Sequence, residues 1–542
     1  MSHLTPLDWV VIAAYFAAVF GVAVWATRRE RTTRRTSSGY FLAGRNVGWF
    51  IIGASLFASN IGSEHLVGLA GSGADGGVAV GQFEILASLI LILLGWVFVP
   101  FYLRSGVFTM PEFLERRYSA GARWYLAVIS IIGYVLTKIS VTIAAGGIVF
   151  ETLMGIDFWT GALIVVVATG VYTIFGGLRA VLYTDMLQMF VLVGGAVTVT
   201  AIGLAAVGGW DALREITGGD FFNVWQPHDH PDYPWTGILF GAPILGVWYW
   251  CTDQYIVQRC LSGRNLDEAR RGTLFGGLLK VLPIFIFVLP GVIAYALAQT
   301  GRLDLGEADQ ALPALVGVLL PAGLRGLVVA GLLAALMSSL SSVFNSCSTL
   351  ITWDIYRKLR PAATERRLVL VGQIATIVMV GLGLLWIPMM DHVSDKLYKY
   401  IQSVQGYISP PIAAVFLLGL FWPRVNARGA MSALIAGFVL GMVRLVAEIN
   451  AGGLPGWLEA YAAVNFLHFA FYLFAACVAV LVVVSLATAP PERRRIADLT
   501  YATVEPSDDP RATSRPARRR QDLVLTLVLA ALVAAVWLTF RG

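Results

Sequence analysis

The sequence predicts an all-α integral membrane protein, on three observations. The chain has 542 residues, of which 57% are hydrophobic and only 13% are charged, and its mean hydropathy is +0.73. Apolar segments long enough to cross a bilayer, about 20 residues each, recur along its length. One stretch, residues 53–84, is polar and rich in glycine although its surroundings are apolar. No separate soluble domain fits between the apolar segments, which excludes a large soluble enzyme.

We expect fourteen apolar segments to span the membrane. They lie near residues 7–27, 47–72, 79–103, 122–151, 157–176, 180–207, 235–258, 272–299, 313–352, 366–388, 398–421, 427–449, 463–488 and 523–540. Arginines follow the first segment rather than precede it, so a cleavable signal peptide is not expected. The region 489–521, rich in proline, arginine and serine, is expected to be a disordered cytoplasmic linker.

Arginine in the loops predicts the orientation of the chain. Arginine clusters follow the first, third, seventh, ninth, eleventh and thirteenth segments, whereas loop 208–234 has only Arg214 against five acidic residues. Because cytoplasmic loops carry the excess of lysine and arginine, both termini are expected outside the cytoplasm. Only 5 of the 39 basic residues are lysine, which indicates a GC-rich bacterium and therefore its inner membrane. Charge placed in this way reports topology and indicates no nucleic-acid partner.

Stretch 53–84 is the candidate binding region. It carries the polar side chains of Asn60, Ser63, Glu64, His65, Asp75 and Glu84. A lipid-facing helix would not tolerate them, whereas interrupted helices that line a cavity have such sequences. The alternative is a packed helix pair whose polar groups face a neighbour.

A second interruption predicts internal symmetry. The seventh segment carries Gly237, Gly241, Pro243 and Gly246. Two broken segments in corresponding positions are typical of transporters built from inverted repeats, with the substrate site between them. Segments two to six would then mirror segments seven to eleven. The expected division is 1–46 (first helix and basic loop), 47–207 (first repeat), 208–234 (outer loop), 235–421 (second repeat), 422–488 (additional helices), 489–521 (linker) and 522–542 (last helix).

Long motifs follow one another along the chain. They are ASNIGSEH (58–65), QFE (82–84), PEFLERRY (111–118), YTIFGGLRAVLYTD (172–185), WYWCTDQYIVQRCL (248–261), AALMSSLSSVFNS (334–346) and YIQSVQGYISPP (400–411). Together they resemble the sodium/glucose cotransporters of the solute:sodium symporter family, from about Gly39 to Pro491. The resemblance implies a LeuT-type fold of two inverted five-helix repeats, and a sodium-coupled symporter that imports a monosaccharide by alternating access.

The resemblance implies where sodium binds. The principal site would be formed by Ala58, Ile61, Ala335, Ser338 and Ser339. Broken-helix carbonyls and serine hydroxyls supply the hard oxygen ligands that Na⁺ prefers. Without the resemblance, the two serines would indicate helix–helix packing. A second sodium ion would bind at Ser59, Asp185, Ser341 and Ser342. In the competing interpretation, Asp185 instead pairs with a cation such as Lys138 or Arg179.

Residue types and the resemblance together indicate a sugar site. Sugar hydroxyls need donors and acceptors around them, and an aromatic face against the ring. The expected rim is Asn60, His65, Glu84, Lys280 and Gln402. Tyr249, followed by Trp250, is the expected inner gate and stacking face, and Phe83 the outer gate. The alternatives are a purely structural Glu84–Lys280 ion pair, and interfacial roles for Tyr249 and Trp250.

Some positions depart from the pattern of the family. Gly246 and Ala87 stand where a sugar-binding relative has polar side chains, and Lys399 where some relatives have an acid. The alternative substrate is therefore myo-inositol or another small polar solute. Asp253 and Arg259 are expected to lock the cytoplasmic side of the gate. The rival function is a sugar sensor that binds without concentrating its ligand.

The remaining motifs indicate no enzyme. No nucleophile–base pair or metal motif appears, and HDHPD at 228–232 is expected to be an exposed polar turn rather than a metal site. No organic cofactor is expected. The expected partners are co-transported Na⁺, a small sugar and the lipid bilayer.

Overall fold

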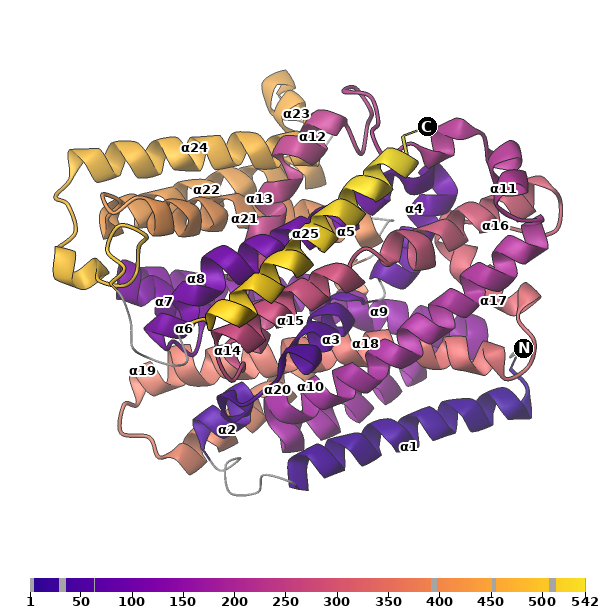
Figure 1. The fold of residues 1–542 in the computed structure, drawn as a ribbon, viewed down its shortest axis with the longest axis horizontal. Helices are drawn as coiled ribbons and strands as arrows, with labels where there is room; N and C mark the ends of the chain where they lie inside the picture. Colours follow the sequence, from indigo (N-terminus) through magenta and orange to yellow (C-terminus); the bar gives the residue numbers. More distant parts are fainter. Residues whose placement is uncertain are drawn as a thin grey trace.

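The computed structural model describes residues 4–28, 36–62, 64–390, 397–450, 455–505 and 513–541, which form a helical bundle without β-strands (Figure 1). The first helices are α1 (Pro6–Arg28), α2 (Ser37–Leu42), α3 (Trp49–Asn60), α4 (Leu69–Gly76), α5 (Gln82–Leu93), α6 (Val99–Ser105), α7 (Met110–Arg117), α8 (Ala120–Tyr134), α9 (Ser140–Val149), α10 (Phe158–Val207) and α11 (Trp210–Thr217). The later helices are α12 (Trp235–Phe240), α13 (Ala242–Gly246), α14 (Gln254–Leu261), α15 (Leu266–Leu279), α16 (Leu289–Gln299), α17 (Ala311–Leu319), α18 (Leu324–Thr349), α19 (Arg357–Leu359), α20 (Glu365–Met390), α21 (Leu397–Phe421), α22 (Ala427–Ile449), α23 (Gly456–Ala463), α24 (Phe466–Ala487) and α25 (Pro516–Thr539).

Within the described chain, 11 helices are long and apolar enough to cross a membrane, against the fourteen spans that the sequence predicts. Of the three missing spans, one is lost because 235–258 is divided among the short helices α12, α13 and α14, and two are lost where expected spans run together. Helix α10 contains two of them, joined at Gly177, whose φ of 59° is left-handed. A Cβ there would meet the carbonyl oxygen of Tyr40 at 2.5 Å, so the turn requires glycine. The run from His65 to Ser105 also joins parts of two expected spans, at Gly77. The number fourteen therefore stays a prediction.

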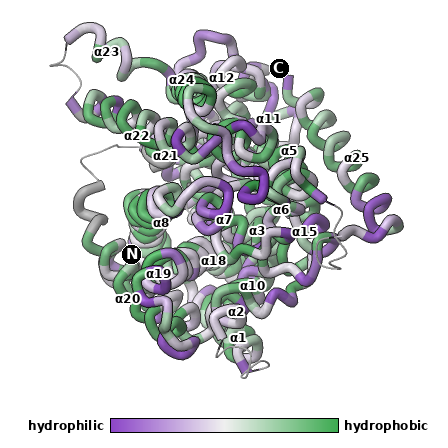
Figure 2. Tube along the Cα trace, turned by 90° about the vertical axis from the view of Figure 1, so that its left-hand side faces the viewer, coloured by the Kyte–Doolittle hydropathy of each residue, from purple (hydrophilic) through white to green (hydrophobic). Residues whose placement is uncertain are grey.

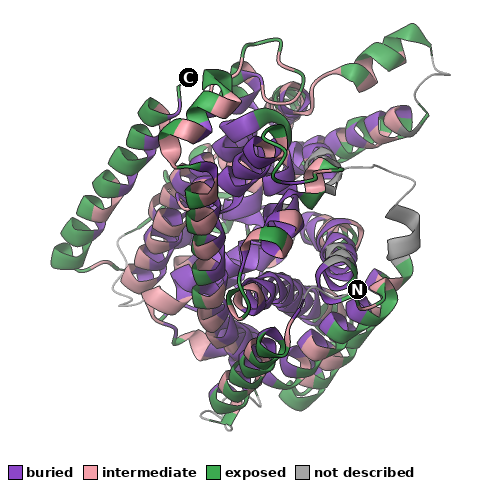
Figure 3. Ribbon diagram, turned by 90° about the vertical axis from the view of Figure 1, so that its right-hand side faces the viewer, coloured by how far each residue is buried: buried purple, intermediate pink, exposed green. Residues whose placement is uncertain are grey.

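The bundle has a buried centre and an apolar periphery. Helix α18 is buried along almost its whole length and packs against α10, while α3 packs against α15. Figure 3 shows the buried segments at the centre and the exposed faces on the outer helices. The outer helices α20, α22 and α25 are largely hydrophobic in Figure 2, as expected for surfaces that meet lipid tails.

Both ends of the described chain lie at the same end of the bundle. Figure 1 shows them on the right, while α2, α7 and α19 lie at the opposite end. This arrangement agrees with the expectation that the two termini share one side of the membrane. Which side faces the cytoplasm stays a prediction from the loop arginines.

Two helices of the centre are interrupted, as the sequence predicts. The first break follows α3, where Ile61 is extended and the π-helical turn η3 (Glu64–Gly68) comes next. The second separates the π-helical turn η9 (Val247–Thr252) from α14, at the extended residue Asp253. Interrupted helices leave backbone groups free to bind something other than their own helix. The repeat boundaries stay a prediction.

Candidate functional site

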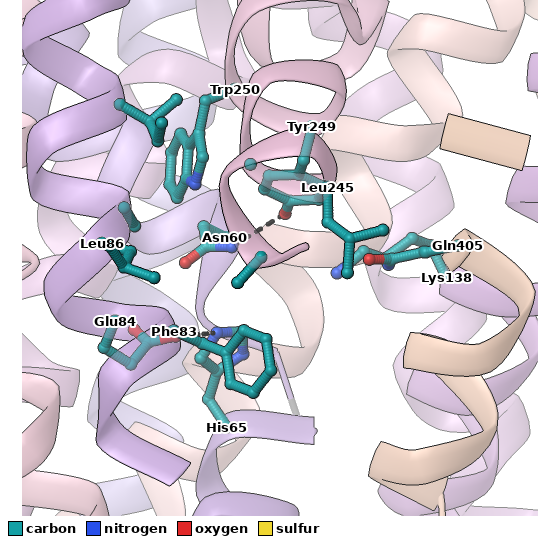
Figure 4. Close-up of a pocket in the computed structure, with 14 residues that line it drawn as sticks. Asn60, His65, Phe83, Glu84, Leu86, Lys138, Leu245, Tyr249, Trp250 and Gln405 are labelled. Atoms are coloured by element: carbon teal, nitrogen blue, oxygen red, sulfur yellow. Dashed lines mark hydrogen bonds and ion pairs between the residues drawn. The ribbon is translucent and has the colours of Figure 1, made fainter. Parts of the chain in front are cut away.

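A cavity of about 80 Å³ lies between the two broken helices (Figure 4). Residues far apart in the sequence meet in its walls. They are Asn60, His65, Phe83, Glu84, Leu86, Ala87, Ile90, Lys138, Ala242, Leu245, Gly246, Tyr249, Trp250 and Gln405. An apolar wall with a few converging polar groups is typical of sites for small polar molecules.

The first break places polar side chains on this cavity. Helix α3 ends at Asn60, Ile61 has φ −74° and ψ 99°, and His65 follows on η3. Turns of this π-helical type often occur at functional sites. Phe83 and Glu84 come from the first turn of α5, after the chain reverses at Gly77. The glycine-broken sequence thus brings four of the predicted side chains to one wall.

A buried charge cluster lies on one side of the cavity. Glu84 Oε1 is 3.2 Å from His65 Nε2, and Glu84 Oε2 accepts a hydrogen bond from Lys280 Nζ. Lys280 also donates to Asn60 Oδ1. Its side chain is 1% exposed and is not among the lining residues, so it supports Glu84 and Asn60 from behind. The structural ion pair therefore exists, and Glu84 faces the cavity as well.

Tyr249 and Trp250 form the wall opposite this cluster. The Asn60 Nδ2 atom donates to the Tyr249 hydroxyl at 2.8 Å, and the Tyr249 and Tyr255 hydroxyls are 3.0 Å apart. The Lys138 ammonium lies 5.2 Å from the centre of the Tyr249 ring, within the range of a cation–π contact. Tyr249 thus contacts the break in α3 directly, as an inner gate residue would.

Phe83, next to Glu84 on α5, lines the cavity and contacts two further aromatic rings. Its ring lies 6.0 Å from that of Tyr233, in the outer loop, and 6.3 Å from that of Phe466, at the start of α24. Three aromatic rings from separate elements, one of them in the outer loop, therefore pack together beside the cavity.

Ser339 links α18 to the carbonyl groups of the first break. Its Oγ donates to the carbonyl oxygen of Ser59 at 3.0 Å and lies 3.4 Å from that of Ile61. Ala58 and Ala335 are buried on α3 and α18, which pack against each other. These oxygens are of the kind that binds Na⁺. The neighbouring Ser338 instead donates to Asp185 Oδ1 at 2.7 Å.

Asp185 collects three hydroxyls and one cation. Its Oδ2 accepts from Ser55 at 2.5 Å and from Ser59 at 3.1 Å, in addition to the Ser338 contact at Oδ1. The Arg259 guanidinium lies 3.5 Å from Oδ2, and both side chains are fully buried. Asp185 is therefore paired, as the competing interpretation expects, but the cation beside it is Arg259. Lys138 lies on the cavity, and Arg179 lies over the Tyr183 ring at 5.2 Å.

Arg259 also reaches two of the serines around Asp185. Its Nε donates to Ser55 Oγ at 2.9 Å and its Nη2 to Ser342 Oγ. Ser341 donates to the backbone of its own helix, at Ser338 O, 3.0 Å away. Asp253, the other residue of the expected lock, accepts from the Tyr134 hydroxyl and from the Tyr255 amide at 3.2 Å. The two residues thus join different parts of the bundle to α14.

The structure brings most of the predicted site residues together and adds others. The Gln402 and Lys399 side chains lie outside the described residues, but Gln405, three residues further along α21, lines the cavity. Ala87 and Gly246, noted as departures from the family pattern, line it too. Ser55 could have been found from its position one turn before Ser59 on the same helix face.

In the HDHPD turn, the His230 side chain is hydrogen-bonded to nearby backbone amides. The Nδ1 atom of His230 accepts from the amides of Asp232 and Tyr233, at 3.2 and 3.0 Å. Across the described residues, no group of three His, Cys, Asp or Glu side chains could hold a metal ion. The turn also contacts α24, because the Asn465 side chain donates to the Pro231 carbonyl at 2.7 Å.

Comparisons with known proteins identify relatives of this chain. A model of the sodium:solute symporter family matches residues 40–437. The sodium/glucose cotransporter 1 of Oryctolagus cuniculus is 42% identical over 527 residues, which cover 89% of this chain and 79% of the relative. The sodium/myo-inositol cotransporter 2 of Sus scrofa is 41% identical over 538 residues, covering 92% and 79%.

Two solved structures share the fold. A Na⁺-coupled sialic acid symporter in a substrate-bound outward-open state has a TM-score of 0.78 at 23% identity, covering 90% of this chain and 99% of the other. A nucleobase-cation-symport-1 family transporter in a closed conformation has a TM-score of 0.54 at 16% identity, covering 82% and 96%. The expected LeuT-type, all-α membrane fold is confirmed.

Proposed function

We propose that this chain, which belongs to the sodium:solute symporter family, is a sodium-coupled symporter that imports a monosaccharide of the glucose or galactose type. The proposal rests on the identity of its relatives and on one structural observation. A continuous set of hydrogen bonds joins the cavity to the oxygens expected to bind sodium. It runs from Asn60 through the Tyr249 and Tyr255 hydroxyls to the Ser59 carbonyl, which Ser339 also approaches.

This connection supports coupling between the two ligands. Sodium at the Ile61 carbonyl and the Ser339 hydroxyl would order the break that carries Asn60. A sugar in the cavity would use Asn60, His65, Glu84 and Gln405 for its hydroxyls and the Tyr249 and Trp250 rings for its apolar face. Because both ligands then bias the same conformational equilibrium, each tightens the binding of the other.

The driving force is the electrochemical gradient of sodium. An inward membrane potential contributes about 2.3 kcal/mol per charge per 100 mV. The proposed cycle makes and breaks no covalent bond, and the relatives are transporters. In this cycle the residues of the chain bind and orient the two ligands and open or close access to the cavity.

Uptake by reconstituted protein tests the proposal. Purified protein in proteoliposomes would be given labelled glucose or galactose with an inward sodium gradient, and with a sodium ionophore as control. We expect accumulation above equilibrium that the ionophore abolishes. Unlabelled myo-inositol, pentoses and hexoses would compete in separate samples.

The competition distinguishes the substrates. Inhibition by hexoses supports the proposal, and preferential inhibition by myo-inositol replaces the monosaccharide by a polyol. Sugar binding without accumulation would support a sensor and contradict symport.

A further inference from the structure

A groove on the outside of the bundle has no role in the transport cycle proposed above. It lies between α1 and the first half of α10 and has a volume of about 340 Å³. Phe20, Val24, Thr27 and Arg28 line it from α1, and Val171 and Phe175 from α10. Its volume is within the range of small-molecule sites.

The walls of the groove are apolar and face outward. Val24 is 47% exposed, Val171 43% and Phe175 58%, on helices that meet the hydrocarbon of the bilayer. The floor is fixed by Tyr172, whose ring contacts Phe20 edge to face at 6.3 Å and whose hydroxyl donates to the Met337 carbonyl at 3.1 Å. A preformed apolar hollow at this depth fits a lipid acyl chain.

The end of the groove is basic. Arg28 is the charged residue among the described residues that line it, and no carboxylate in the described part of the chain pairs with it. The sequence continues with Arg29, Arg31, Arg34 and Arg35. Phe175 lies two residues before Gly177, where α10 turns. The first half of α10 therefore ends beside Arg28, the last residue of α1. The loop arginines predict that this end faces the cytoplasm.

We propose that this groove binds one phospholipid with an anionic headgroup, its phosphate on Arg28 and an acyl chain along the apolar walls. Basic pockets between membrane helices on the cytoplasmic side are suited to anionic headgroups, and clusters of arginine just past a span attract them. A zwitterionic lipid would fill the same hollow but carries no net charge for Arg28.

Native mass spectrometry of the full chain in detergent measures this binding without any transport assay. The protein would be titrated with phosphatidylglycerol or with phosphatidylcholine of the same acyl chains. We expect tighter binding of phosphatidylglycerol. Arg28→Gln should lower that affinity about fivefold, the contribution of one basic residue near an anionic surface. Val24→Trp, which fills the hollow, should lower the affinity for both lipids.

Two matched variants serve as controls. Arg428→Gln removes an exposed arginine at the start of α22, and Val10→Trp adds the same bulk to α1 at a residue that is 62% exposed and does not line the groove. Neither should change lipid binding.

Three outcomes would overturn the proposal. They are equal binding of both lipids, equal losses in the control variants, and displacement of the lipid by glycerol 3-phosphate, which would indicate a site for a soluble anion. Because the readout is lipid binding, each is independent of whether the chain transports sugar.

Discussion

Each of the two broken helices is interrupted at an extended residue, but the surroundings of the two breaks differ. Ile61 has φ −74° and ψ 99°, and Asp253 has φ −75° and ψ 128°. Such similarity is what inverted repeats would produce. The difference lies in which groups satisfy the freed backbone.

At the first break, hydroxyl groups of other helices are the partners, whereas the second break combines such a hydroxyl with a cap from its own sequence. The Ser59 carbonyl accepts from the Ser339 and Tyr255 hydroxyls, on α18 and α14. At the second break, the Asp253 carboxylate caps α14, and the Tyr102 hydroxyl donates to the Cys251 carbonyl at 2.6 Å. Hydroxyl and carbonyl oxygens can rearrange around a cation. At the start of α14, by contrast, the Tyr255 amide already has the Asp253 carboxylate as its partner. From this comparison we predict ion binding at the first break and gating at the second.

The largest expected effect concerns Arg259, which connects the two breaks. It lies on α14, which begins at the second break, and pairs with Asp185 beside the first. Arg259→Gln should lower the free energy of unfolding by about 3–5 kcal/mol, because it leaves a buried carboxylate without its cation. Thermal denaturation of the purified protein measures this loss.

The double variant Arg259→Gln with Asp185→Asn tests the pairing. It should recover part of the stability lost in the single variant. Strictly additive losses would mean that the two side chains are not coupled and that the breaks are not joined through them.

The next effect sharpens the assignment of sodium to the first break. Ser339→Ala removes the hydroxyl at the Ser59 and Ile61 carbonyls, so the sodium concentration for half-maximal uptake should rise about tenfold. Ser348→Ala is the matched control, since it removes a buried hydroxyl of the same helix that donates to the Gly372 carbonyl. If the sodium dependence of Ser339→Ala were unchanged, sodium would have to bind at another site.

A smaller effect is expected where the gate meets the cavity. Tyr249→Phe keeps the ring and loses the hydroxyl that accepts from Asn60 and lies 3.0 Å from the Tyr255 hydroxyl. The loss of one hydrogen bond should raise the sugar KM about fivefold and weaken its dependence on sodium. If the KM rose equally at every sodium concentration, the hydrogen bonds from Asn60 to Ser59 would not carry the coupling.

The smallest effect is expected at the second break, where the Asp253 carboxylate caps α14. Asp253→Asn keeps an acceptor for the Tyr255 amide, and Asn caps helices about as well as Asp, so stability should change by less than about 0.5 kcal/mol. Sodium dependence should not change at all. A shift in sodium affinity comparable to that of Ser339→Ala would contradict the prediction that sodium binds at the first break alone.

The sequence predicts the broken helices and their polar residues because charged groups at membrane depth are costly and are kept mainly where they bind or pair. It therefore leads to Asn60 and Glu84, whereas the role expected of Tyr249 comes from the family resemblance. It does not predict that Arg259 stands beside Asp185, because that distance depends on how α14 and α10 pack around α3 and α18. Gln405 is missed for a similar reason, since the rotation of α21 decides whether its side chain reaches the cavity. The count of spans differs because Gly77 and Gly177 reverse the chain without a loop that composition would reveal, and because 235–258 is divided into short helices.

Helix α25 has a consequence for how the protein is made. Its Trp537 indole donates to Gln82 Oε1 at 2.7 Å, its Thr526 hydroxyl accepts from the Trp96 indole at 2.9 Å, and its Asp522 pairs with Arg271 at 3.0 Å. A ribosome reaches residues 516–539 long after Gln82, Trp96 and Arg271 have been made. Until translation ends, Gln82 and Trp96, which lie in an expected span, are without these partners in the membrane, which is costly there. A nascent chain that stops early would therefore carry a polar stripe that membrane quality control can recognise.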